Sequence, residues 1–297
     1  MIDPTAQIIL GAMQAGAHPM PADTSAWLHE YRTQLDALPQ WQGPPPDIEI
    51  VEQPGLRLYR PHPGPGLRPT VLFIHGGGFV GGTLHGYDIP LRWLALRSGW
   101  QVAAVDYRLA PEHPYPAAPD DCRDALDALA QGQHDADPSR LAVMGDSAGG
   151  LLATVMARHA RDTGIPLRQQ ILLYPNTDLR PGPLYKTRAQ YEGVVIRMAE
   201  LYRSLDLYLA GQDRTAPDIS PLCASLTGLC PALLITTEND PLRGDAEAYA
   251  AKLRAAEVPV VEECLPGMIH GVLQYAATVP AGDALITRVA SALGSLG

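Results

Sequence analysis

The sequence predicts an α/β protein, built on a mostly parallel, doubly wound β-sheet that begins with an antiparallel hairpin. From Thr70 onward, short apolar runs alternate with longer segments of helical periodicity. These runs are apolar along their whole length, which is typical of strands buried on both faces of a sheet. The helix-length connections between them indicate parallel pairing of successive strands.

The first expected elements are a helix and a hairpin. Residues 25–38 place apolar side chains on one helical face, and Pro39 ends the pattern. Two strand patterns follow at residues 48–51 and 56–59, on either side of a Pro-Gly turn. The core sheet therefore starts with an antiparallel pair.

The alternating region supplies the remaining strands and their helices. We expect strands at residues 71–74, 102–105, 141–144, 170–173, 232–235 and 260–264. Helical patterns lie near residues 88–97, 120–130, 149–160, 246–256 and 283–293. The interval between the fourth and fifth of these strands is too long for one crossover, which indicates an insertion.

The insertion covers about residues 181–217 and contains an apolar helical pattern from Val194 to Leu209. We expect it to form, together with residues 1–45, a helical cap over the carboxyl edge of the sheet. A chain of 297 residues fits one α/β core with such additions, so residues 1–297 are expected to be a single domain.

Bulk composition excludes several classes of protein. Hydrophobic residues make up 46% of the chain and charged residues 18%, which favours a large buried core over disorder. The net charge of −10 comes without any run rich in lysine and arginine. We therefore expect no nucleic-acid partner and no stable membrane anchoring, and a small neutral molecule as the substrate.

The N-terminus lacks the basic segment of a secretory signal, and no apolar stretch reaches the roughly 18 residues of a membrane span. A cytoplasmic location is expected. The four cysteines are scattered without a C-x-x-C pair, so they predict neither a disulfide framework nor a zinc site. We expect no bound metal.

The strongest functional motif is Gly-Asp-Ser-Ala-Gly at residues 145–149, between an expected strand and an expected helix. A nucleophile elbow places its serine in this strained strand-to-helix turn, where small neighbours avoid clashes. Ser147 is therefore the predicted nucleophile. The alternative is a glycine-rich turn whose serine only caps the helix.

A second motif, His-Gly-Gly-Gly-Phe at residues 75–79, directly follows the strand expected at 71–74. Consecutive glycines allow backbone N–H groups to converge on one point and stabilise an oxyanion. We predict Gly77, Gly78 and Ala148 as the donors. A phosphate loop is disfavoured, because the segment has neither a Gly-x-Gly-x-x-Gly pattern followed by an acid nor a Gly-Lys-Ser/Thr ending. His75 itself is expected to orient the loop.

The order nucleophile, acid, histidine along the chain restricts the choice of general base. Only His159 and His270 follow Ser147. His159 falls within the helix after the elbow, too early to leave room for a strand carrying the acid. His270 lies in a loop after an apolar run and is the predicted base.

The acid is expected at the end of the preceding strand, where residues 233–237 run into Glu238, Asn239 and Asp240 before a proline. Asp240 is the predicted acid. Glu238 and Asp245 stay open as alternatives, although Asp245 has the position of a first-turn acid in the next helix.

Together these motifs resemble the bacterial hormone-sensitive lipase-like family of α/β-hydrolase esterases. The resemblance spans about residues 71–272 and rests on residues 75–79, 106–118, 145–150, 240–243 and 270–271. It implies a capped α/β-hydrolase fold, activity on carboxylic esters with short to medium acyl chains, and no cofactor. It also implies that residues 106–118 brace the oxyanion loop and line the pocket wall. Leu151 and the Glu238-Asn239 pair depart from the family pattern.

The combined prediction is a serine carboxylesterase with an acyl-enzyme intermediate and a small-molecule ester as substrate. A related amidase, lactonase or thioesterase would use the same residues, and a non-catalytic small-molecule receptor can share the fold. The sequence is compatible with a homodimer. Four apolar residues are candidates to shape the acyl pocket, with core packing as the other interpretation: Val194, Val195, Met198 and Leu201.

Overall fold

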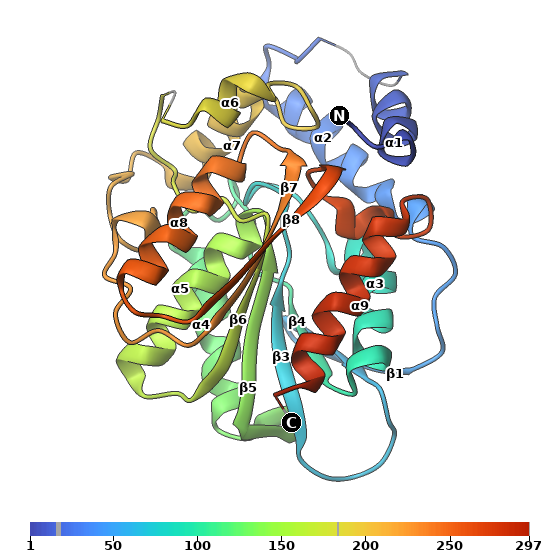
Figure 1. Cartoon of the computed structure of the whole chain (residues 1–297), viewed down its shortest axis with the longest axis vertical. Helices are drawn as coiled ribbons and strands as arrows, with labels where there is room; N and C mark the ends of the chain where they lie inside the picture. Colours follow the sequence, from blue (N-terminus) through green and yellow to red (C-terminus); the bar gives the residue numbers. More distant parts are fainter. Residues whose placement is uncertain (16–18, 183, 297) are drawn as a thin grey trace.

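The computed structural model describes residues 1–15, 19–182 and 184–296. In these residues the chain forms one eight-stranded sheet in the order β1-β2-β4-β3-β5-β6-β7-β8 (Figure 1). The strands are β1 Glu49–Gln53, β2 Leu56–Arg60, β3 Arg68–Ile74, β4 Gln101–Val105, β5 Ala136–Asp146, β6 Leu167–Leu173, β7 Ala232–Asn239 and β8 Val260–Ile269. β2 is antiparallel to both β1 and β4, and the other neighbours are parallel. The predicted fold class is confirmed.

Helices connect the strands and flank the sheet. The α-helices are α1 Pro4–Ala15, α2 Thr24–Asp36, α3 Leu84–Ser98, α4 Ala117–Ala130, α5 Ala148–Thr163, α6 Lys186–Gln190, α7 Met198–Leu209, α8 Arg243–Ala255 and α9 Pro280–Gly294. Short 3₁₀ helices are η1 Leu38–Trp41, η2 Gln133–Asp135, η3 Pro221–Cys223 and η4 Val272–Tyr275. Each strand and each core helix expected from the periodicity is present, with boundaries shifted by a few residues.

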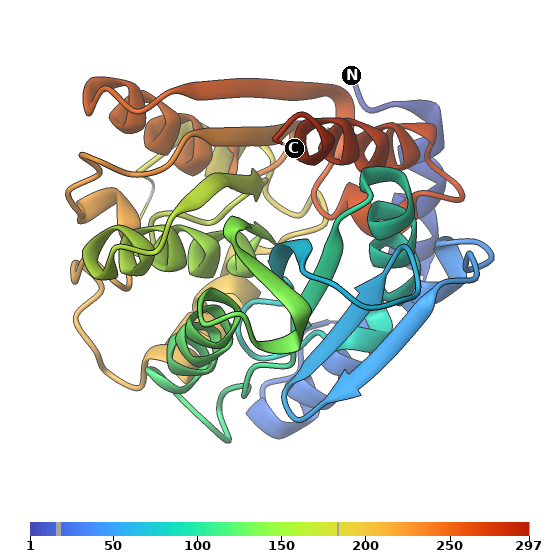
Figure 2. The same ribbon diagram turned by 90° about the horizontal axis from the view of Figure 1, so that it is seen from below.

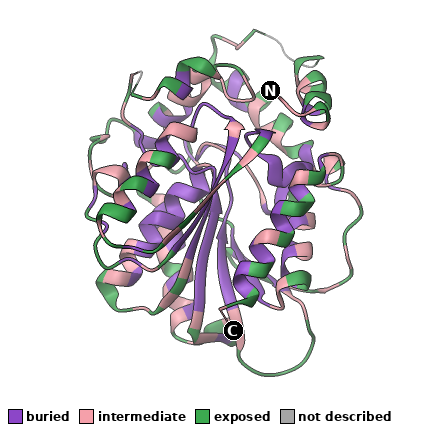
Figure 3. Ribbon diagram, viewed as in Figure 1, coloured by how far each residue is buried: buried purple, intermediate pink, exposed green. Residues whose placement is uncertain are grey.

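The sheet separates two hydrophobic cores. Helices α4, α5 and α8 cover one face, whereas α3 and α9 cover the other (Figure 2). The central strands are buried on both faces and are almost uniformly apolar (Figure 3). This double burial explains why the sequence shows continuous apolar runs rather than alternation.

The direction of winding reverses between β3 and β5. The chain leaves β3 for β4 on one side and returns to β5 on the other side of β3. Loops that follow two such strands diverge to opposite faces and leave a crevice at their carboxyl ends. The two glycine motifs follow β3 and β5 and therefore meet at this crevice.

Two features of the predicted cap segments differ from the expectation. Residues 4–15 form helix α1, which the sequence did not predict because Gly11 interrupts its pattern. Ala6 and Ile9 of this helix are buried, and tertiary packing of this kind stabilises a short helix. The helical pattern expected from Val194 begins only at Met198, because Val195 has a φ of 69° that a helix cannot accommodate.

Helices α1, α2, α6 and α7 all lie at the end of the molecule where β7 and β8 terminate (Figure 1). Residues 16–18 and 183, which belong to the predicted cap segments, lie outside the described residues. Within the described ranges, no helix combines the length and the hydropathy that crossing a membrane would need.

A buried ion pair attaches the short helix α6 to α8. Arg188 donates from Nη2 to Asp245 Oδ2 at 2.6 Å and from Nε to Oδ1 at 3.2 Å. The two side chains are 3% and 0% exposed. Arg188 Nη2 also donates to the Asp178 carbonyl at 2.7 Å. The contact joins the insertion to the segment that follows β7.

Replacing Arg188 with methionine is expected to lower the free energy of unfolding by about 3–5 kcal/mol, because it leaves a buried carboxylate without its partner. Urea denaturation at neutral pH measures this loss. Arg254→Met is the matched control, since Arg254 is 49% exposed in its pair with Glu262 and should cost less than about 1 kcal/mol. Equal losses in the two variants would contradict the prediction.

Candidate active site

Ser147 occupies a sharp turn between β5 and α5. Its backbone has φ 53° and ψ −119°, a conformation that is costly for a residue with a Cβ. The turn requires glycine on both sides. A Cβ on Gly145 would overlap the Gly149 carbonyl, and a Cβ on Gly149 would overlap the Ile74 carbonyl of β3. The local sequence therefore selects a turn that exposes one hydroxyl at the crevice.

Three side chains distant in sequence form one hydrogen-bonded chain at the carboxyl edge of the sheet. The Ser147 hydroxyl lies 2.8 Å from His270 Nε2, and His270 Nδ1 lies 2.7 Å from Asp240 Oδ2. Ser147 follows β5, Asp240 follows β7 and His270 follows β8. The fold brings together the three residues predicted as nucleophile, acid and base.

Additional donors orient Asp240. Its Oδ1 accepts the Leu242 N–H at 2.8 Å, and its Oδ2 accepts the Thr237 hydroxyl at 3.1 Å. The carboxylate is fully buried. With the His270 N–H, three donors converge on a group that has only acceptors when it is ionised. These three donors fix the orientation of the carboxylate, which in turn holds the imidazole in one orientation.

The other titratable residues weighed for these roles have different partners. Glu238 Oε2 accepts the Gly267 N–H at 2.6 Å and does not contact His270. Asp245 pairs with Arg188. His159 Nε2 lies 2.8 Å from Asp127 Oδ1 on the neighbouring helix α4. The geometry therefore favours Asp240 among the acids that the sequence left open.

The glycine loop after β3 turns toward the nucleophile. Gly77 and Gly78 have φ of 116° and 62°, values that favour glycine. Neither residue gives its N–H to an acceptor in the described part of the chain. Ala148 opens α5, where helix N–H groups have no intrahelical acceptor. The N–H groups of Gly77 and Gly78 thus have no acceptor among the described residues, and the α5 dipole adds to the attraction for an anion.

The segment after β4 supports this loop. The Tyr107 hydroxyl donates to the His75 carbonyl at 2.8 Å, and the two rings stack with centroids 4.2 Å apart. The Ala110 N–H donates to the Phe79 carbonyl at 3.0 Å. Arg32 of α2 donates to the Ala110 carbonyl at 3.1 Å. These contacts agree with the bracing role that the resemblance implied.

The His75 side chain bonds to the loop rather than to the nucleophile. Burial lowers the pKa of its imidazole to about 4, so the ring is neutral at neutral pH. Nδ1 lies 2.8 Å from the Gly76 carbonyl, to which it donates when the proton is on that nitrogen. His75 therefore orients the oxyanion loop, as the sequence suggested.

The residues of α2 and α7 nearest the oxyanion loop were not among those the sequence singled out. A Cβ on Gly78 would lie 3.2 Å from Ser204 Oγ and 3.4 Å from Tyr31 Oη. Of the predicted pocket residues, Val194, Val195 and Leu201 pack against the hydrophobic cores. Helical spacing alone could not distinguish the side of α7 that faces the oxyanion loop from the side that packs against the hydrophobic core.

Sequence reasoning also assigned no role to Asp146, which precedes the nucleophile. Its carboxylate is buried and accepts hydrogen bonds from Gly76 N at 2.8 Å and from Tyr87 Oη at 3.0 Å. One signal was present in the sequence, because Asp146 directly follows the apolar run of residues 141–145 at the end of β5.

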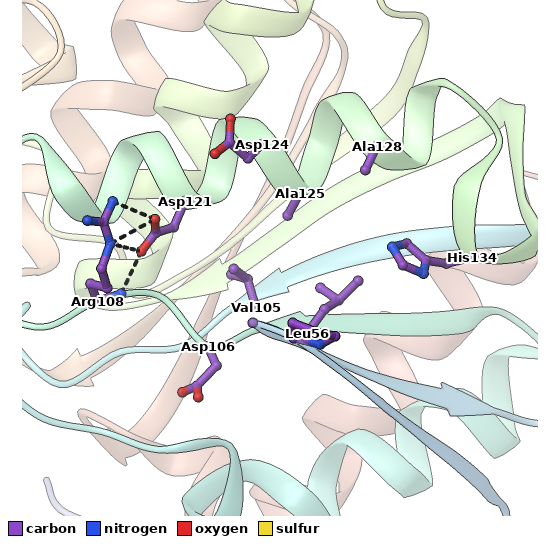
Figure 4. Close-up of a pocket in the computed structure, with 11 residues that line it drawn as sticks. Leu56, Val105, Asp106, Arg108, Asp121, Asp124, Ala125, Ala128 and His134 are labelled. Atoms are coloured by element: carbon purple, nitrogen blue, oxygen red, sulfur yellow. Dashed lines mark hydrogen bonds and ion pairs between the residues drawn. The ribbon is translucent and has the colours of Figure 1, made fainter.

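A cavity of about 380 Å³ lies away from the catalytic residues, between the β1–β2 turn and α4. Figure 4 shows Arg108 in this cavity bound to Asp121, with Asp106 and Asp124 nearby. Both of these aspartates are exposed. Among the described residues, no group of three or more His, Cys, Asp or Glu side chains could hold a metal ion. The cavity therefore has no feature that competes with the serine site.

The fold together with a strained serine, a bonded imidazole and free backbone donors defines a serine hydrolase. A family model described as alpha/beta hydrolase fold matches residues 71–274. The chain belongs to this family, in its hormone-sensitive lipase-like branch of esterases, and the predicted resemblance is confirmed.

Individual relatives agree with this assignment. The carboxylesterase NlhH of Mycobacterium tuberculosis is 40% identical over 248 residues, covering 80% of this chain and 77% of that protein. The ethyl acetate hydrolase of Pseudomonas putida is 36% identical, covering 83% of this chain and 81% of that protein. A solved esterase structure from Pyrobaculum calidifontis superposes with a TM-score of 0.91 at 34% identity, covering 99% and 98% of the two chains.

Proposed function

We propose that this protein is a serine carboxylesterase that hydrolyses esters with short to medium acyl chains through an acyl-enzyme. Ser147 is the nucleophile, His270 the general base and Asp240 the residue that orients the histidine. The observation that carries the proposal is the continuous path from Ser147 Oγ through His270 to Asp240, with distances of 2.8 and 2.7 Å. The ethyl acetate hydrolase among the relatives supports a small acyl group.

In the acylation half, His270 Nε2 removes the hydroxyl proton as Ser147 Oγ bonds to the ester carbonyl carbon. The carbonyl oxygen becomes an oxyanion and accepts hydrogen bonds from the N–H groups of Gly77, Gly78 and Ala148. The carbon–oxygen bond to the alcohol then breaks. His270 gives its proton to the leaving alcohol, and the acyl group stays on Ser147.

In the deacylation half, water takes the place of the alcohol. His270 removes a proton from water as its oxygen attacks the acyl carbon, and the same three N–H groups hold the second oxyanion. The bond to Ser147 Oγ breaks, the serine regains its proton from His270, and the carboxylic acid leaves. No redox step or cofactor enters this sequence of bonds.

The proposal includes a single domain over residues 1–297 with a helical cap from residues 1–45 and about 181–217. The position of α1, α2, α6 and α7 beyond the ends of β7 and β8 supports it. The approach of Tyr31 of α2 and Ser204 of α7 to Gly78 also supports it, because both residues belong to the proposed cap segments. The cap would limit the length of the acyl chain.

A cytoplasmic location also stays part of the proposal. Four cysteines, Cys122, Cys223, Cys230 and Cys264, are free thiols in the part of the chain that the structure describes, as is typical of proteins in a reducing compartment. Fractionation of the source cells, followed by detection of the native protein, tests the location.

A panel of p-nitrophenyl esters tests the function. We expect turnover of the acetyl, butyryl and octanoyl esters, with kcat/KM for the palmitoyl ester at least about tenfold lower because the cap restricts long chains. The matching anilides and thioesters test the related amidase and thioesterase activities, and a lactone tests the lactonase. A folded protein that turns over none of these substrates would instead support the alternative function, a non-catalytic small-molecule receptor with the same fold.

A further inference from the structure

We propose that the ionised carboxylate of Asp146 is a positioning group that holds the oxyanion loop, residues 75–82, against the nucleophile elbow. The inference rests on the proposed function, since it concerns the donors that would stabilise the oxyanion. Asp146 contacts neither substrate nor reacting atoms. It acts through Gly76, the residue immediately before Gly77.

The contacts form a closed clamp between β5, the loop after β3 and helix α3. Asp146 is 1% exposed. Its Oδ1 accepts the Gly76 N–H at 2.8 Å, and its Oδ2 accepts the Tyr87 hydroxyl at 3.0 Å. The Gly76 nitrogen also lies 3.2 Å from Tyr87 Oη. One carboxylate therefore joins the elbow to the backbone that carries two of the proposed oxyanion donors.

The clamp is matched to a group that has acceptors and no donor. Gly76 N–H and Tyr87 O–H both point at the carboxylate, so an ionised aspartate satisfies both. A protonated carboxyl or an asparagine amide brings an extra donor to the same place. One buried donor would then lose its partner, and a buried donor without a partner is costly enough to displace the loop.

The space around Gly76 shows how closely the parts approach. A Cβ at Gly76 would lie 2.9 Å from Asp146 Oδ2, 3.0 Å from the Asp146 carbonyl oxygen and 3.1 Å from Tyr87 Oη. Only glycine permits this distance between loop and elbow. The carboxylate fills the contact, so a smaller side chain at position 146 would leave the loop without support.

The ionised form predominates at neutral pH, and a modest fall in pH protonates it. Burial raises the pKa of the Asp146 carboxyl to about 6, while the hydrogen bonds from Tyr87 and Gly76 and the charge of protonated His270 oppose this rise. The titratable groups that face Asp146 come from α3, the loop after β4, the ends of β6 and β8, and η4: Tyr87, Tyr107, Tyr174, His270 and Tyr275. No lysine or arginine is among these described neighbours.

Two protonations should therefore lower activity on the acid side of the pH profile. One converts the base His270 to a form that cannot accept a proton, and the other breaks the clamp at Asp146. Where both groups titrate, the slope of log kcat/KM against pH should exceed about one for the wild type. It should approach about one for Asp146→Asn, which cannot titrate.

The kinetic experiment compares Asp146→Asn with the wild type on the acetyl ester. We expect kcat to fall by about tenfold or more with KM within about threefold, because the loss affects the transition-state oxyanion rather than substrate binding. Tyr87→Phe removes one donor from the carboxylate, so its acid limb should move to higher pH while the slope stays above about one. Unchanged kcat and slope in Asp146→Asn would overturn the proposal.

Two matched controls should keep the wild-type profile. Asp178→Asn alters a buried aspartate that is bonded to Arg180 and Tyr185 instead of the loop. Tyr59→Phe removes a buried tyrosine hydroxyl that donates to Asp88 at 3.2 Å. A change of slope in either control equal to that in Asp146→Asn would assign the effect to general loss of buried polar contacts.

An NMR titration gives a test that does not depend on ester turnover. The amide proton of Gly76 should shift with pH through a transition near the pKa of about 6 in the wild type, and Asp146→Asn should lose that transition. If the wild type hydrolyses no ester but shows the transition, the proposed function fails while the clamp stands. Absence of the transition in an active wild type overturns the clamp alone. If Asp146→Asn does not fold, the shifted Gly76 transition in Tyr87→Phe decides.

Discussion

Replacing Ser147 with alanine is expected to lower kcat for the acetyl ester by on the order of 10⁶-fold. The reason is that the variant has no atom that can form the acyl-enzyme, although the loop and His270 stay in place. Alanine also fits the turn, since it keeps the Cβ that the φ of 53° already accommodates. Steady-state kinetic assays with p-nitrophenyl acetate measure the loss of kcat, and circular dichroism checks that the variant is folded.

Ser139→Ala is the matched control for this experiment. Ser139 lies at the start of β5, at the opposite end of that strand from the elbow, and its side chain bonds only to Asp137 among the described residues. Its kcat should stay within about twofold of the wild type. A phosphonate inhibitor adds a direct readout, because it should label the wild type and Ser139→Ala covalently but not Ser147→Ala. Labelling of Ser147→Ala at wild-type rate would show that another residue is the nucleophile.

Replacing Asp240 with asparagine is expected to lower kcat by about 10⁴-fold. Three donors meet at this carboxylate, from His270, Thr237 and Leu242. An asparagine amide can donate to His270 Nδ1, which must then accept instead of donate. The imidazole therefore takes the tautomer with its proton on Nε2. That nitrogen can then no longer accept the proton of Ser147. The pH profile of kcat, measured with the acetyl ester, reports the loss.

Glu238→Gln is the comparison that discriminates between the acids the sequence left open. Glu238 lies two residues before Asp240, but its carboxylate bonds to the Gly267 N–H and lies near the N-terminal amine. We expect its kcat within about threefold of the wild type, because the side chain does not contact His270. A larger loss in Glu238→Gln than in Asp240→Asn would transfer the acid's role to Glu238.

The residues that the sequence identified most directly are those whose requirement is local. The elbow needs glycine at positions 145 and 149 because a Cβ at either would overlap nearby backbone. The oxyanion loop needs glycine at 77 and 78 because both have positive φ. Such demands act on a few neighbouring residues, so they leave a pattern that can be read along the chain. Uniformly apolar strands predicted the sheet because strands that are buried on both faces carry apolar residues at successive positions.

The sequence by itself determined the α/β fold class, the position of the serine turn and the family of the chain. Only the tertiary structure showed that His270 bonds to Asp240 and that Gly76 bonds to Asp146, and that α7 presents Ser204 to the oxyanion loop. The physical reason is that these features depend on contacts between distant segments, such as His270 with Ser147 across 123 residues and Asp146 with Gly76 across 70. A hydrogen bond forms according to where two side chains point after folding, and neighbouring residues in the sequence do not encode that direction.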